Sequence, residues 1–178
     1  MYFITGNKNK FAEVKAILPD VEQLDVELPE IQELDPHKII KAKLEAAFQH
    51  LQGEFIVEDT SLYFESLNGF PGPLIKWLSQ AIGNDGLVNL AQKLGNDQVV
   101  AKTIIGYAKS PNEIHFFEGE VPGRIVPVAA ESAFGWDPIF IPTGYEKTYA
   151  EMTAAEKNKI SMRQIATNKL KEYLDANE

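Results

Sequence analysis

Apolar positions in the first third of the chain follow strand-like and helix-like spacing in turn. An apolar run at residues 2–4 leads into small polar residues and lysines, and apolar side chains then recur at helical spacing up to residue 18. A weak strand is predicted near residues 21–28, and helical spacing returns at residues 35–51. This second helix begins with Asp35-Pro36, which suits its N-cap and first position.

Longer apolar runs in the middle of the chain predict longer strands. The run at residues 54–64 predicts a buried strand that ends in acids, Glu58-Asp59. Two short helices are predicted at 74–82 and 85–94. Two long runs at 99–110 and 113–126 are separated by Pro111-Asn112, which favours an antiparallel pair of strands.

The C-terminal segment carries two successive helix-start signals. Thr153 to Glu156 and Ser161 to Gln164 both have the form of a capping box, so we predict a short helical turn, a break and a longer helix from Ser161. Met162 and Arg163 then lie in the first turn, where backbone N–H groups attract anions. The mixed order of strands and helices along the chain predicts an α/β protein with a mixed sheet.

Composition narrows the class of protein. With 178 residues, 44% of them hydrophobic, the chain can bury a core, and we expect a single domain over residues 1–178. No apolar run is long enough to span a membrane, and the start lacks the pattern of a signal peptide. The absence of cysteine excludes disulfides and thiolate sites and fits a cytoplasmic protein. A net charge of −9 argues against nucleic-acid binding, although a few converging lysines can still bind a small anion.

The turn after the first strand has two interpretations. Gly6, Asn7, Lys8 and Lys10 stand at a predicted helix start, where N–H groups and lysines can receive phosphate oxygens. The alternative is a solvated, lysine-rich helix start with Asn7 as its N-cap. The Walker pattern of a phosphate-binding loop is absent.

Other stretches also leave alternatives open. Glu58-Asp59 suits a divalent cation that prefers oxygen ligands, but an acidic strand end bonded to backbone N–H groups has the same sequence. Since neighbouring strand residues face opposite sides, only one of the two acids is expected to reach a site. The aromatic residues of "FGWDP" can stack on a base or lie in the core, and Lys157 and Arg163 can be site cations or helix surface.

Taken together and in order, these stretches resemble the inosine triphosphate pyrophosphatases, which hydrolyse non-standard purine nucleoside triphosphates. The resemblance rests on "TGNKNKFAEV", "LPEIQ", "VEDTSLYFESLNGFPGPLIKW", "FEGEVPGRIV", "FGWDPIF" and "GYEKTYAEMTAAEKNKIS". It implies an elongated mixed β-sheet flanked by helices, two lobes with a cleft between them, and a homodimer. It also implies magnesium-dependent hydrolysis of ITP, dITP or XTP to the monophosphate and pyrophosphate.

The resemblance also implies roles for individual residues. Glu30 and Asp59 resemble the magnesium ligands, with Asp59 also the base for the attacking water, and Lys43 matches a cleft lysine, with Lys41 as the alternative. The positions that resemble substrate-binding residues are Thr5, Gly6, Asn7, Lys8, Asn9 and Lys10 for the triphosphate, then Thr60 and Lys76, and Phe134, Gly135, Trp136, Asp137, Lys157, Met162 and Arg163 nearer the base.

One position departs from the family pattern. The family normally has Ser-His-Arg where this chain has Ser161-Met162-Arg163, and methionine has no N–H donor for the 6-oxo group of a purine. Arg163 then remains to read that oxygen, or base selection is relaxed or redirected toward other modified or pyrimidine triphosphates. A catalytically idle nucleotide-binding protein is the remaining alternative, and the retained acids and lysines argue against it.

Overall fold

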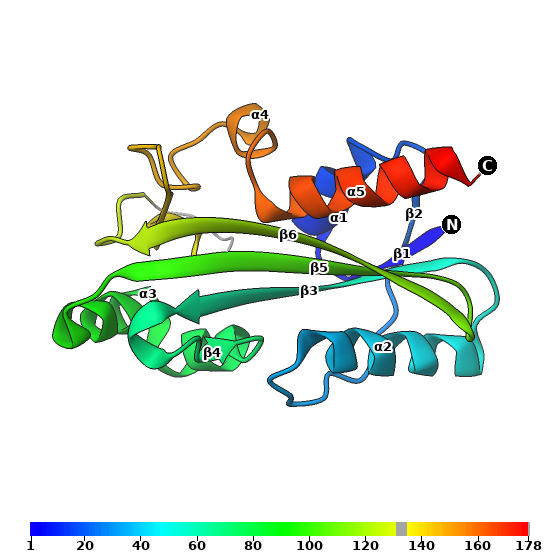
Figure 1. The fold of residues 1–178 in the computed structure, drawn as a ribbon, viewed down its shortest axis with the longest axis horizontal. Coiled ribbons are helices and arrows are strands. Elements are labelled where there is room, and N and C mark those ends of the chain that lie inside the picture. Colours follow the sequence, from blue (N-terminus) through cyan, green and yellow to red (C-terminus); the bar gives the residue numbers. More distant parts are fainter. Residues whose placement is uncertain (131–134, 178) are drawn as a thin grey trace. The chain divides into compact units, whose positions relative to one another are not determined.

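The computed structural model of the chain describes residues 1–130 and 135–177, which form a mixed β-sheet flanked by helices (Figure 1). Strand order in the described sheet is β2-β1-β3-β5-β6-β7, with β4 beside β3. The strands are β1 (Tyr2–Ile4), β2 (Glu22–Leu24), β3 (Phe55–Phe64), β4 (Pro71–Gly72), β5 (Gln98–Ser110), β6 (Glu113–Ile125) and β7 (Phe140–Pro142). The helices are α1 (Lys8–Lys15), α2 (Pro36–His50), α3 (Ile75–Leu94), α4 (Ala154–Lys157) and α5 (Met162–Ala176), with 3₁₀ turns at Glu65–Leu67 and Asp137–Ile139. The expected α/β class with a mixed sheet is confirmed.

The chain divides into two compact units. The first comprises Met1–Thr60, Thr103–Gly119 and Met162–Glu178, and the second comprises Ser61–Lys102 and Glu120–Ser161. Strands β3, β5 and β6 each contribute residues to both units. The cleft that the resemblance implies stays a prediction.

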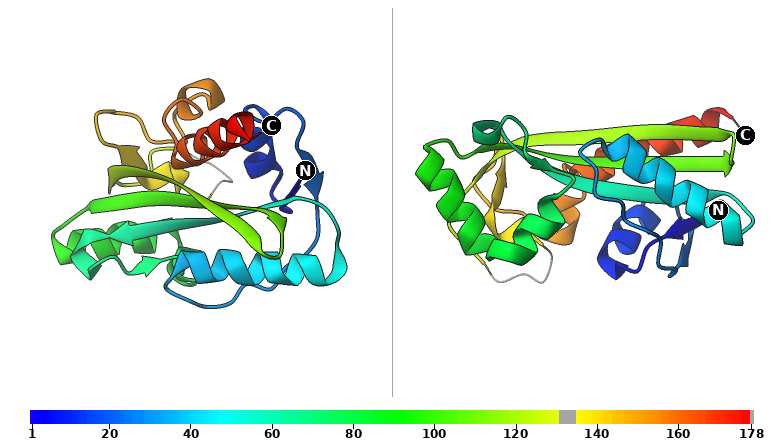
Figure 2. Two further views of the ribbon diagram at one scale, coloured as in Figure 1. Left: turned by 45° about the vertical axis from the view of Figure 1, so that its right-hand side comes forward. Right: turned by 90° about the horizontal axis from the view of Figure 1, so that it is seen from below.

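Both faces of the sheet are covered in the first unit. Figures 1 and 2 show α2 on one face and α1 with α5 on the other. Strand residues alternate between these faces, as strand geometry requires. On β3, Ile56 belongs to the apolar cluster of α1 and α5, whereas Phe55 and Val57 belong to the cluster of α2. The direction in which a β3 side chain points therefore follows from its place in this alternation.

Two glycines let the helices approach the strands closely. A Cβ atom on Gly106 of β5 would lie 2.2 Å from Cγ2 of Ile40 on α2. A Cβ atom on Gly119 of β6 would lie 1.9 Å from the backbone oxygen of Met162, the first residue of α5. The clash at Gly119 is with backbone, which cannot rotate away, so this glycine fixes how closely the start of α5 packs on the sheet.

The helix and the strands predicted in the first unit are present, with differences at two of the strands. Asp35 is the N-cap of α2, and its side chain accepts a hydrogen bond from the His37 N–H, with Pro36 in the first helical position. The weak strand predicted at 21–28 is the three-residue β2. The strand predicted at 54–64 is β3, but Glu58 and Asp59 lie in its middle, so the prediction that they stand at a strand end is wrong.

The second unit confirms further local signals. The two short helices predicted at 74–82 and 85–94 are the halves of α3, which is interrupted at Gly83, where φ is 67°. Thr153 and Glu156 form the predicted capping box of α4. The two-residue turn between β5 and β6 joins neighbouring strands, as expected of an antiparallel pair. Among the described residues, no helix is long and apolar enough to cross a membrane.

The close approach at Gly119 makes a prediction about stability. We expect Gly119→Ala to lower the free energy of unfolding by about 1–3 kcal/mol, because the added methyl group forces α5 away from β6. Urea denaturation of the variant and the wild type measures the difference. Glu120→Ala, at the neighbouring exposed position, is the control and should change it by less than about 0.5 kcal/mol. Equal stability of Gly119→Ala and wild type would contradict the tight contact.

Candidate functional site

The opening turn lies at the carboxyl end of β1. The side chain of Asn7 accepts hydrogen bonds from the N–H groups of Asn9 (3.0 Å) and Lys10 (3.1 Å), so Asn7 is the N-cap of α1. The Asn7 N–H donates to the hydroxyl of Thr5 at 3.1 Å. Residues 6–9 are exposed. The turn is therefore fixed by its own hydrogen bonds while presenting exposed backbone at a helix N-terminus.

Strand β3 runs past this turn. It pairs in parallel with β1 at Tyr2–Phe55 and Phe3–Ile56, and β1 ends at Ile4. Val57 lies opposite Ile4 in this register, so residues 58–60 of β3 extend beyond the end of β1. The carboxyl ends of parallel strands are where open α/β sheets usually bind ligands. The opening turn and the acids of β3 meet at this edge.

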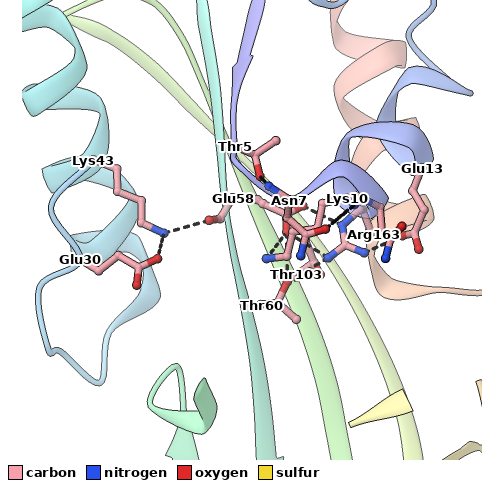
Figure 3. A network of polar contacts seen from close by, with 11 residues as sticks. Thr5, Asn7, Lys10, Glu13, Glu30, Lys43, Glu58, Thr60, Thr103 and Arg163 are labelled. Carbon is pink, nitrogen blue, oxygen red and sulfur yellow. Dashed lines mark hydrogen bonds and ion pairs between the residues drawn. The ribbon is translucent and has the colours of Figure 1, made fainter. Parts of the chain in front are cut away.

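Glu58 is the centre of a buried polar network (Figure 3). The Lys10 ammonium lies 2.7 Å from Oε1 of Glu58. Arg163 donates from Nε to Oε2 of Glu58 at 2.7 Å and from Nη2 to Oε1 at 3.0 Å, and its Nη1 bonds Glu13. The Thr60 hydroxyl donates to Glu58 at 3.2 Å. The network therefore links α1, β3 and the first turn of α5.

The charges of this network stabilise one another. Burial alone would raise the pKa of Glu58, but the Arg163 guanidinium and the Lys10 ammonium outweigh it and hold that pKa well below its usual range. For Arg163 the signs are reversed: burial alone would lower its pKa, but the carboxylates of Glu58 and Glu13 raise it. Only 3% of the Glu58 side chain and 1% of the Arg163 side chain are exposed. Both groups are therefore charged at neutral pH although they are buried.

A second group of charges lies on the opposite face of β3. The Lys43 ammonium, on α2, donates to the backbone oxygen of Glu58 at 3.2 Å and lies 3.6 Å from Oε1 of Glu30. Figure 3 shows Lys43 and Glu30 on one side of β3 and the Glu58 network on the other. Lys41 is exposed, so Lys43 is the lysine that contacts β3. Glu30 is thereby held close to the peptide that joins Glu58 to Asp59.

The direction of Asp59 follows from strand alternation. Asp59 shares the face of Phe55 and Val57, which pack on α2, whereas Glu58 shares the face of Ile56. The expectation that the two acids face opposite sides agrees with this geometry. The half-buried Asp59 side chain therefore points to the same side as Glu30 and Lys43.

The second unit contains the other predicted residues. Asp137 and Lys157 form a buried ion pair, and the Lys157 ammonium also lies 5.3 Å from the centre of the Tyr149 ring. Trp136 is buried and packs edge-on against Phe140. The backbone oxygen of Gly135 accepts a hydrogen bond from Asn84, Lys76 lies over the ring of Trp77, and Phe134 is outside the described residues.

Met162, where the sequence departs from the family pattern, is a buried residue. Met162 is 1% exposed at the start of α5, next to Arg163, and its backbone oxygen faces Gly119. Met162 therefore contributes to the packing between α5 and β6. Arg163, which was expected to be helix surface or to read a base oxygen, bonds two carboxylates.

Two residues of the network, Glu13 and Glu58, were not predicted from the sequence as partners of Arg163. Glu13 lies one helical turn after Lys10 on α1, and its carboxylate bonds Arg163. Glu58 was considered only as one of a pair of acids at a strand end. The signal available in the sequence was the apolar run Phe55 to Val57, which Glu58 follows directly. An acid on a buried face of a strand needs a cationic partner.

The buried ion pair between Glu58 and Arg163 predicts that loss of the Glu58 carboxylate strongly lowers the stability of the protein. We expect Glu58→Ala to lower the free energy of unfolding by about 3 kcal/mol, because it leaves the Arg163 guanidinium buried with one carboxylate fewer. Thermal and urea unfolding measure this loss. Glu45→Ala, at an exposed position of α2, is the control and should have little effect. A Glu58→Ala protein as stable as the control would show that Arg163 does not depend on Glu58.

Comparison with known proteins shows the family of the chain. The inosine triphosphate pyrophosphatase of Schizosaccharomyces pombe is 40% identical over 178 residues, covering 98% of this chain and 94% of that protein. The protein of the same name from Ajellomyces capsulatus is 44% identical, covering 97% of this chain and 94% of its own length. The solved structure of the Staphylococcus aureus Ham1 protein has a TM-score of 0.81 at 27% identity, covering 99% of this chain and 98% of its own. The model of the Ham1 family matches residues 1–173, and the chain therefore belongs to the Ham1 family.

Proposed function

We propose that this protein is a magnesium-dependent nucleoside triphosphate pyrophosphohydrolase that acts on non-standard purine nucleotides such as ITP, dITP and XTP. The observation that carries the proposal is the meeting of three features at the end of β1: the opening turn, the acids of β3, and the Lys43–Glu30 pair. Lysines and helix N–H groups suit a triphosphate, and the carboxylates of Glu30 and Asp59, which lie on the same side of β3, suit its metal. Relatives at 40% and 44% identity are named inosine triphosphate pyrophosphatases, which supports the purine substrate.

Glu30 and Asp59 fit a magnesium ion by the chemistry of their donors. Mg²⁺ takes oxygen ligands and needs only one or two carboxylates when phosphate oxygens and waters supply the rest. Among the described residues, no group of three or more acidic, histidine or cysteine side chains is suited to hold an ion. When bound, the ion would neutralise charge on the triphosphate and activate the attacking water.

Asp59 is our candidate for the general base. In the proposed reaction a water oxygen bonds the α-phosphorus, the bond from that phosphorus to the bridging oxygen breaks, and pyrophosphate leaves. Asp59 accepts the proton that the water loses. Lys10, Lys43 and the N–H groups of the turn hold the phosphates in place, which lowers the entropic part of the barrier.

The base-binding part of the proposal rests on the resemblance. We assign Gly135, Trp136, Asp137 and Lys157 of the second unit to the base, and Thr60 and Lys76 to other substrate contacts. We further propose that the protein is cytoplasmic and forms a homodimer. Size-exclusion chromatography with light scattering tests the homodimer. Met162 favours a second candidate, the same reaction with relaxed base selection, since no histidine donor stands at this position.

A panel of nucleotides tests the function. We expect pyrophosphate release from ITP and XTP in the presence of Mg²⁺ and none in EDTA. One unpaired donor costs a 6-amino base about 1–3 kcal/mol, which is roughly 5- to 150-fold in rate. Without the histidine, we expect the preference for ITP over ATP to lie toward the lower end of that range. Equal rates with all purine and pyrimidine triphosphates would favour the relaxed enzyme, and nucleotide binding without hydrolysis would favour an idle protein.

A substitution at Asp59 tests the reaction centre. We expect Asp59→Asn to lower kcat by about 10²–10⁴-fold, because the amide keeps the size of the side chain but cannot accept the proton. Initial rates of pyrophosphate release from ITP measure the change. Asp20→Asn, on an exposed part of the chain, is the matched control and should retain full activity. Near wild-type turnover by Asp59→Asn would place the reaction centre elsewhere.

A further inference from the structure

We propose that Glu58 is a positioning residue that occupies, in the free protein, the place of a phosphate group at Lys10. Its carboxylate holds the Lys10 ammonium until a triphosphate takes that ammonium over. This inference rests on the proposed function, because it assumes that the opening turn binds phosphates. Glu58 itself touches neither substrate nor metal in this scheme and acts through Lys10 and Arg163.

The geometry around Lys10 suits an exchange of partners. The Lys10 side chain is 25% exposed, whereas that of Glu58 is 3% exposed, so the cation lies between the interior and solvent. The same residue is in the first turn of α1, whose exposed N-terminal turn attracts anions. Lys10 can therefore turn toward an incoming phosphate while α1 stays in place.

Glu58 remains paired when Lys10 leaves. Arg163 donates two hydrogen bonds to its carboxylate, and the Thr60 hydroxyl donates a third. The loss of Lys10 thus removes one contact from a carboxylate that keeps a buried cation. Arg163 has a second carboxylate, Glu13, so its position does not depend on Lys10. The network can release one lysine without leaving a buried charge uncompensated.

The contact between Glu58 and Lys10 has a consequence for the affinity of phosphate ligands. Phosphate must compete with a carboxylate for Lys10, so removal of the Glu58 charge strengthens binding of a polyphosphate. The same change loosens Lys10 and Arg163, so turnover slows. Tighter binding together with slower turnover separates this role from a merely structural one, since loss of structure would weaken both.

The test measures the affinity of inorganic tripolyphosphate by calorimetry at fixed Mg²⁺ for four full-length proteins: wild type, Glu58→Gln, Lys10→Ala and the double variant. We expect Glu58→Gln to bind about tenfold more tightly than wild type. The gain should vanish in the Lys10→Ala background, because it requires the freed lysine. With ITP, Glu58→Gln should lower both KM and kcat, and Glu58→Asp should restore values close to wild type. Glu45→Gln, the same change on an exposed helix face, controls for net charge and should shift affinity by less than about twofold.

Several outcomes would overturn the inference. Unchanged or weaker binding by Glu58→Gln would do so, as would a gain that persists without Lys10, which would indicate a general charge effect. If Glu58→Gln does not fold, NMR of the Lys10 ammonium in the wild type replaces it, and a signal unaffected by tripolyphosphate is the contrary result. Absence of tripolyphosphate binding by the wild type also counts against it. Tripolyphosphate carries no base, so a protein that shows the coupling but hydrolyses no nucleotide would contradict the proposed function alone.

Discussion

The ion pair between Glu58 and Arg163 joins parts of the chain that are 105 positions apart. It holds the first turn of α5 on β3, and Lys10 and Glu13 attach α1 to the same two side chains. Buried ions are costly unless their partners and remaining hydrogen bonds are all present. The side chains of Lys10, Glu13, Glu58 and Arg163 thus depend on one another, and the network adds to the pairing of β1 with β3 in fixing the opening turn.

Most helices and strands could be predicted because their signals are local. A capping side chain, a proline in the first turn or an alternating apolar run acts within a few residues, as Asp35, Pro36 and Thr153 illustrate. The place of Glu58 within β3 could not be predicted, for the opposite reason. Acids are rarely buried, so Glu58 looks like a strand end unless its distant cation Arg163 is known.

The candidate site was predictable only in part. Physical reasoning from the sequence identified a phosphate-binding turn and a metal-binding acid as possibilities, and the resemblance to a family assigned Glu30, Lys43 and Arg163. A charged side chain on a helix has the same local pattern whether it lies in solvent or in a buried pair. Glu13 shows this, since its role depends on Arg163 at the other end of the chain.

The alternation along β3 also constrains how this chain can change in length. Glu58 and Asp59 have opposite surroundings because they are consecutive, so an insertion of one residue after Phe55 would exchange the two acids between faces. It would also move Ile56 out of its apolar cluster. The hairpin turn at Pro111-Asn112 carries no such requirement, since both of its residues are exposed. Length variation among related chains should therefore be absent from the first half of β3 and tolerated at that turn.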